Sequence, residues 1–209
     1  MIYLFIVLYG LTLVYFGLSE RVSRFVYLLS AQGLILFALV FESLHETQLI
    51  ELILILIETI VVKAILIPWF LNRLRKRNHL KRLHESFLPV FYNVIIIVFI
   101  WVLSFVLGNN LNFEELHTPF FSAALASVTC GIYFIIIHKN VFSHLTGYLI
   151  IENGVFLLSL SVGSKFPHFV SLAVLLDVLM GVLVLGLFLN KVRDTFQDIS
   201  VQSLSKLKD

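Results

Sequence analysis

Apolar segments of about 20 residues recur along the whole chain and are separated by short polar stretches. A helix of about 20 residues crosses the ~30 Å hydrocarbon core of a bilayer, and helices satisfy their own backbone hydrogen bonds there. The pattern therefore predicts an all-α polytopic integral membrane protein with about seven transmembrane helices. The predicted spans are residues 1–18, 25–42, 49–71, 88–107, 119–138, 145–163 and 168–190.

Composition supports this class. Of the 209 residues, 59% are hydrophobic and 13% are charged, with a mean hydropathy of +0.99, whereas soluble domains carry about a quarter charged residues. The first segment has no basic start and no small-residue cleavage motif, so we interpret it as an uncleaved span. The single cysteine, Cys130, excludes an intrachain disulfide and a cysteine-based metal site, and is expected to serve as a packing residue.

The basic residues predict the orientation. With the N-terminus outside and the C-terminus in the cytoplasm, nearly all of the 15 Lys and Arg residues face the inside, as the positive-inside rule requires. The exceptions are Lys165, outside, and Lys63, within a span. The predicted inside residues are Arg21, Arg24, Arg73, Arg75, Lys76, Arg77, Lys81, Arg82, Lys139, Lys191, Arg193, Lys206 and Lys208.

Four regions follow from this layout. They are an N-terminal four-helix segment (1–107), an external loop (108–118), a three-helix segment (119–190) and a cytoplasmic tail (191–209). The basic connection at 72–86 is either a simple topology signal or a docking surface for anionic lipid or an acidic partner.

Two pairs of segments resemble each other across the external loop. YLLSAQGLILFALV (27–40) resembles YLIIENGVFLLSLS (148–161), and AILIPWFLNRLRKR (64–77) resembles VLVLGLFLNKVRD (182–194). Because apolar helices also resemble one another by chance, both a duplication and a coincidence remain open.

Four ionisable residues lie well inside predicted spans: Glu58, Lys63, Glu152 and Asp177. A charge at the bilayer centre costs about 2.5–3.5 kcal/mol on insertion scales, and such residues often mark proton pathways. We therefore predict that these four residues form a proton relay. The alternative is that they make structural interhelical hydrogen bonds, which is the interpretation we favour for Gln32 and Asn153.

Glu58 and Lys63 are five residues apart, which places them about 140° apart on an α-helix and not in an i,i+4 pair. Each is therefore expected to meet a partner on another helix. His138 and His144, at the inner side, could begin a proton entry path to Glu152 or could be ordinary interfacial histidines. No metal-binding or catalytic motif occurs, so we expect no metal, no cofactor and no active site of its own.

Small residues recur at a spacing of four in SAALASVTCGIYF (122–134). This spacing lets a neighbouring helix approach closely. The segment is therefore predicted to be a packing surface.

The residues from 119 to 209 resemble the K subunit of respiratory complex I (NuoK-like). GYLIIENGVFLLSLSV places Glu152 at that family's carboxyl in the second span, and SLAVLLDVLMGVLVLGLFLNKVRD places Asp177 at the third, where the family usually has Glu. The whole chain resembles the HyfE-like family of hydrogenase-4 membrane components, through AQGLIL (31–36) and VVKAILIPWFLNRLRKR (61–77).

The resemblance implies a non-catalytic membrane subunit of a proton-translocating hydrogenase or complex I-like complex in a bacterial or archaeal cytoplasmic membrane. Its implied partners are antiporter-like membrane subunits, a hydrogenase membrane anchor and the lipid bilayer, with no nucleic acid. The alternatives are a self-contained ion-coupled secondary transporter and a structural membrane scaffold.

Overall fold

The computed structural model describes residues 1–19, 21–43, 56–77, 88–111, 117–138 and 141–162. The chain divides into a compact unit of Met1–Val174 and a second unit of Leu175–Asp209. All of the described residues belong to the first unit, so the predicted seventh span, with Asp177, lies outside them.

The described elements are all helical. They are α1 (Ile2–Leu18), α2 (Val22–Ser43), the π-helix η1 (Glu58–Leu66), α4 (Ile67–Arg77), α5 (Val90–Leu111), α6 (Thr118–Ile137) and α7 (Val141–Val162). Four of them, α2, α5, α6 and α7, are long and apolar enough to cross a membrane, and α1 is a shorter apolar helix of 17 residues. The all-helical, membrane-type fold predicted from the hydrophobic pattern is confirmed within the described part of the chain.

Several predicted boundaries differ from the structure. Residues 108–111, predicted as the start of the external loop, form the last turn of α5, and α7 begins at Val141, before the predicted start at 145. The additions, GNNL at 108–111 and VFSH at 141–144, mix polar and apolar residues at the helix ends. Hydropathy marks the part of a helix that can lie in lipid, whereas the helix itself continues into the interface as long as its backbone bonds are made.

The third span departs most from the prediction. Instead of an α-helix ending at 71, the chain forms a nine-residue π-helix, η1, followed by α4, which ends at Arg77. Pro68 has no N–H and therefore cannot donate to the carbonyl of Ala64, four residues earlier. The Ser30 hydroxyl donates to that carbonyl instead, at 2.8 Å, so a neighbouring helix satisfies the group that the proline leaves open.

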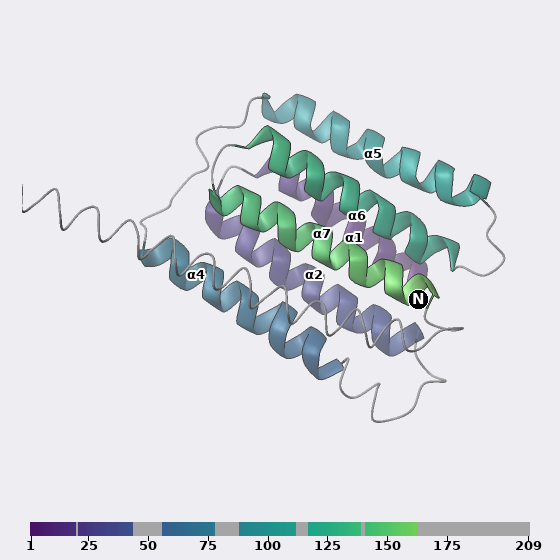
Figure 1. The fold of residues 1–209 in the computed structure, drawn as a ribbon, viewed down its shortest axis with the longest axis horizontal. Helices are drawn as coiled ribbons and strands as arrows, with labels where there is room; N and C mark the ends of the chain where they lie inside the picture. Colours follow the sequence, from purple (N-terminus) through teal and green to yellow (C-terminus); the bar gives the residue numbers. More distant parts are fainter. Residues whose placement is uncertain (20, 44–55, 78–87, 112–116, 139–140, 163–209) are drawn as a thin grey trace, which may run out of the picture. The chain divides into compact units, whose positions relative to one another are not determined.

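The helices pack as a bundle (Figure 1). α2 contacts η1, α4 and α7, and α1 contacts α2, α5 and α6. α5 packs on α1 and α6 and exposes a row of large apolar side chains, including Phe91, Phe99 and Val102, as expected of a helix with one side in lipid.

α6 and α7 form the closest pair in the bundle. The small residues predicted to be a packing surface are buried here: Ser122, Ala123, Ala126, Ser127, Cys130 and Gly131. A Cβ added to Gly131 would lie 2.7 Å from the carbonyl oxygen of Gly147, and a Cβ added to Gly147 would lie 2.9 Å from that of Gly131. The two backbones therefore approach as closely as a pair of glycines permits.

Candidate functional site

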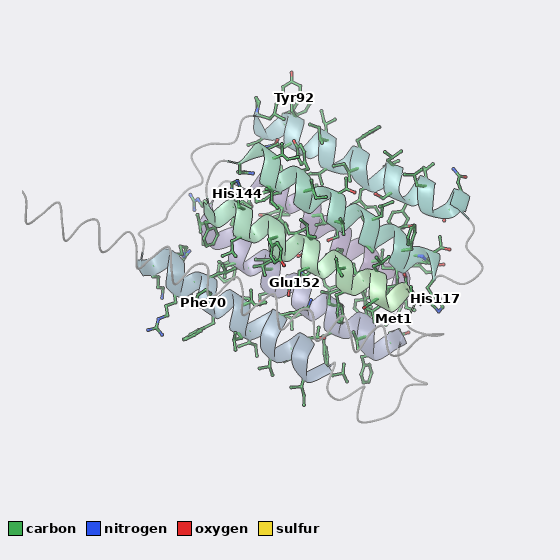
Figure 2. The ribbon with its side chains drawn as sticks, viewed as in Figure 1. Met1, Phe70, Tyr92, His117, His144 and Glu152 are labelled. Carbon is green, nitrogen blue, oxygen red and sulfur yellow. The ribbon has the colours of Figure 1, made fainter. Side chains whose placement is uncertain are left out.

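Polar side chains gather at the middle of the bundle. Gln32 lies near the centre of α2, and Glu152 and Asn153 lie near the centre of α7, where Figure 2 shows Glu152 further along the helix than His144. Their exposed fractions, with that of Lys63 in η1, are small: Gln32 0%, Lys63 4%, Asn153 6% and Glu152 7%. These residues share one buried region within the apolar bundle.

A chain of hydrogen bonds crosses this region from η1 to α1. Lys63 Nζ donates to Asn153 Oδ1 at 3.4 Å, and Asn153 Nδ2 donates to Gln32 Oε1 at 3.1 Å. Gln32 Nε2 then donates to Thr12 Oγ1 at 3.0 Å, and Thr12 Oγ1 donates to the carbonyl of Tyr9 at 2.6 Å. The chain links four helices through their side chains at mid-helix depth, and we refer to it below as the polar chain.

The hydrogen bond that Lys63 donates sets the direction of the polar chain. A protonated lysine only donates, so the carbonyl of Asn153 must face it, and the amide NH₂ of Asn153 must then face Gln32. Lys63 Nζ also lies 4.6 Å from the ring centroid of Phe156, one turn after Asn153 on α7, a cation–π distance. Lys63 therefore meets another helix, as the sequence predicted.

A second set of hydrogen bonds joins the Tyr9 side chain to α6 and α7, and it is separate from the polar chain, which ends at the backbone carbonyl of Tyr9. The Tyr9 hydroxyl and Ser127 Oγ lie 2.7 Å apart, and Ser127 Oγ donates to the carbonyl of Ile150 at 2.8 Å. Because a serine hydroxyl has one proton, Tyr9 must be the donor to Ser127. Tyr9 and Thr12 were not predicted to be site residues, and Ser127 was predicted only to pack, because hydroxyl groups in apolar helices commonly bond to their own backbone and carry no distinct pattern.

Gly33 brings η1 close enough for Lys63 to reach the polar chain. A Cβ at position 33 would lie 2.8 Å from the backbone N of Ala64 and 2.9 Å from the carbonyl carbon of Lys63. The missing side chain therefore lets α2 pack directly on the backbone of the residue that carries the charge.

We expect Gly33→Ala to destabilise the protein by about 1–3 kcal/mol, because the added methyl group overpacks a backbone contact that cannot move without displacing η1. Gly17→Ala is the matched control, since its Cβ would mainly meet the mobile end of Ile97. Thermal unfolding in detergent measures both variants. Equal stability of the two would contradict this account of Gly33.

The π-helix changes the relation between Glu58 and Lys63. Hydrogen bonds in a π-helix run from i to i+5, so positions 58 and 63 lie one turn apart along one face of η1. The separation of 140° expected for an α-helix is therefore wrong, because the segment adopts the wider helix. The side chain of Glu58 lies outside the described structure, as does Asp177.

His138 and His144, which the sequence predicted to lie at the inner side, form a separate group. His138 Nδ1 bonds to the carbonyl of Phe134 at 3.0 Å, and His144 Nε2 bonds to the carbonyl of His138 at 2.6 Å. His138 Nδ1 carries the proton in this bond, because a carbonyl oxygen only accepts. His144 is eight residues, or about 12 Å of helix, from Glu152, and the bonds described for both rings lead to backbone groups.

The amide groups and the ionisable groups have different chemical capacities. Asn and Gln side chains donate and accept hydrogen bonds but have no titratable proton, whereas Lys63 and Glu152 can gain and lose one. The arrangement can therefore hold a buried cation in one orientation, with proton exchange limited to Lys63 and Glu152. Among the described residues, no group of three or more His, Cys, Asp or Glu could hold a metal ion.

Comparisons with known proteins found no match for this chain among protein-family models, curated proteins or solved structures.

Proposed function

We propose that this chain is a membrane subunit of an energy-converting complex of the hydrogenase-4 or complex I type, and that it contributes to proton translocation or to its coupling through the membrane. The single observation that carries the proposal is Lys63, a lysine 4% exposed at mid-helix, held by a hydrogen-bonded chain of side chains from three other helices. A buried cation costs several kcal/mol of solvation free energy. Structural hydrogen bonds alone could be made with neutral side chains at a smaller cost.

The polar chain gives Lys63 a means of acting at a distance. With Lys63 protonated, every bond donates from η1 towards α1. A neutral lysine has a lone pair that can accept a hydrogen bond, so loss of the proton allows the amides of Asn153 and Gln32 to reverse. The protonation state of Lys63 would thus be transmitted laterally across the bundle through the orientation of the Asn153 and Gln32 amides. Glu152, next to Asn153 in sequence, would supply a carboxyl that can exchange the proton.

The membrane arrangement belongs to the same proposal. Seven spans, with the N-terminus outside and the C-terminus in the cytoplasm, would place the basic starts and ends of the helices in the cytoplasm of a bacterium or archaeon. The start of α2 and the end of α4 lie at the same end of the bundle (Figure 1), in agreement with Arg21, Arg24 and Arg73 facing one compartment.

The resemblance to the HyfE-like and NuoK-like families supplies the expected partners, which are antiporter-like membrane subunits and a hydrogenase-type membrane anchor. Purification of the tagged chain in mild detergent, with mass spectrometry of the bound proteins, tests this directly. We expect antiporter-like subunits to copurify in stoichiometric amounts. Recovery of the chain alone, or as a homo-oligomer, would refute it.

A self-contained ion-coupled transporter is the second candidate, and η1 favours it. Transporters place interrupted helices beside their ion sites near the midplane, and η1, followed by Pro68, is a non-α segment that carries the buried lysine. The same purification begins to separate the two candidates, because a self-contained transporter would be recovered without antiporter-like subunits. Such a protein would also transport ions when it is reconstituted alone into vesicles.

A further inference from the structure

Gln32 and Asn153 are equivalent positions of the internal sequence repeat. The alignment of 27–40 with 148–161 relates residues 121 apart, and the side-chain hydrogen bond between Gln32 and Asn153 joins residues 121 apart. In a pair of related units, a residue touches its own counterpart only close to a two-fold axis. The bond therefore indicates that the repeat is a structural relation and that an axis passes between α2 and α7.

The two aligned segments also bury the same faces. Positions on one side of α2 are buried together with their counterparts on α7, and Leu34 is exposed at 55% where its counterpart Val155 is exposed at 38%. The matched buried pairs are Leu29 and Ile150, Gln32 and Asn153, Gly33 and Gly154, Leu36 and Leu157, Leu39 and Leu160, and Val40 and Ser161. A chance likeness of two apolar sequences would not fix which face of each helix turns inward.

α1 and α6 show the same relation. The Tyr9 and Ser127 hydroxyl groups bond to each other, and the rings of Phe16 and Phe134 pack edge to face with centroids 6.2 Å apart. Both pairs are 118 residues apart, and this spacing also aligns the Tyr-Phe pairs at 15–16 and 133–134. Both contacts join residues with the same separation in sequence, and they lie about two helical turns apart along α1. α1 and α6 must therefore run parallel and in register.

The axis therefore runs along the helices. α1 and α2 form a hairpin through a short connection, as do α6 and α7, so α2 and α7 are also parallel. Both connections contain three residues (19–21 and 138–140), so the change of spacing from 118 to 121 arises from additional helical residues at the end of α6 and the start of α7. α5 explains how the units can be parallel: after a unit with three membrane passes, one more pass is needed before the next unit can start on the original side.

We infer that α1, α2 and η1–α4 form one three-helix unit, that α6 and α7 begin a second copy of it related by a pseudo-two-fold axis parallel to the helices, and that Gln32 and Asn153 are paired positioning residues on this axis. The polar chain is then one site shared by both copies. The buried ionisable groups at and beside this site come from different copies: Lys63 belongs to the first, and Glu152, next to Asn153 in sequence, belongs to the second, where the first has Ala31. The rest of the second copy, including 182–194, lies outside the described residues. This inference does not depend on the proposed function.

Exchange of the two amides tests it. Q32N shortens one side of the bond and N153Q lengthens the other, whereas the double exchange Q32N/N153Q keeps the total length and moves the bonded atoms towards α2. The exchange is tolerated only if the surroundings on the two sides of the axis are alike. Two readouts apply to the full chain in detergent: the apparent Tm, and the pH profile of Lys63 modification by an amine-reactive reagent, followed by mass spectrometry.

We expect each single variant to lower the apparent Tm by about 2–4 °C and to shift the midpoint of the Lys63 profile. The exchange should return the Tm to within about 1 °C of the original protein and restore the midpoint. N93Q, which lengthens a buried amide on α5 outside the polar chain, is the matched control and should leave the Lys63 profile unchanged.

Several outcomes would overturn the inference. An exchange variant no more stable than the worse single variant would show that the two positions are not equivalent. A restored Tm with a shifted Lys63 midpoint would make the amides packing residues without a positioning role. Single variants with the Tm and the Lys63 profile of the original protein would show that the bond between Gln32 and Asn153 neither stabilises the fold nor positions Lys63.

Discussion

Under the proposed function, replacement of Glu152 with glutamine is expected to abolish proton translocation by the complex while leaving its assembly intact. Glutamine keeps the size and hydrogen-bonding capacity of the buried side chain but has no proton to exchange, so a structural role would survive the change and a relay role would not. The measurement is acidification of inverted membrane vesicles that contain the whole complex, followed with a pH-sensitive dye, with copurification of the partner subunits as the check on assembly.

The control for Glu152→Gln is Ser159→Ala on the same helix. The Ser159 hydroxyl bonds to the carbonyl of Phe156 within α7, so its loss should affect neither translocation nor assembly. Full translocation by the Glu152→Gln variant would refute the relay role of this carboxyl. Loss of assembly would instead assign Glu152 to the structure of the complex.

Asn153→Leu is expected to be the most destabilising change within the polar chain, at about 2–4 kcal/mol. Asn153 accepts from Lys63 and donates to Gln32, so a leucine of similar size withdraws a partner from a buried charge and from a buried carbonyl at once. Lys63→Met should cost less than about 1 kcal/mol, because an apolar side chain of similar length removes the need to solvate the charge. Thermal unfolding in detergent compares the two variants.

The double variant Lys63→Met/Asn153→Leu provides the decisive comparison. Because the charge is gone, the loss of Asn153 should cost less in this background than in the original protein, and the difference measures the coupling between the two side chains. Additive effects would show that Lys63 gains nothing from Asn153. A Lys63→Met variant as unstable as Asn153→Leu would show that the lysine itself stabilises the fold.

The sequence predicted the type and approximate extent of the helices because burial in lipid imposes a simple rule on composition. α1, α2, α5, α6 and α7 all fall on predicted spans, and the small residues around Ser127 pack as expected. The wrong predictions lie at helix ends, where the helix continues beyond the predicted span, and in the third span, where the backbone departs from an α-helix. Pro68 and its neighbours give η1 in place of an α-helix, and hydropathy contains no information about that choice.

The sequence was less informative about the candidate site. Lys63 and Glu152 stood out because a charge in an apolar segment is costly and therefore conspicuous. The amides of Gln32 and Asn153 were assigned to interhelical hydrogen bonding, which describes their contacts correctly. Their link to Lys63 could not be derived, because it depends on the close approach of α2 and η1 at Gly33.

Composition and residue order were sufficient to predict a helical membrane-type protein, the ionisable residues within its apolar segments, and the similarity of two pairs of segments. These properties depend on the local preference of each segment for lipid or water. The hydrogen-bonded chain of Gln32, Asn153 and Lys63, and the contacts between repeated positions, became visible in the folded structure. Contacts between residues about 120 positions apart depend on helix rotation and register, and these are set by the packing of side chains against one another.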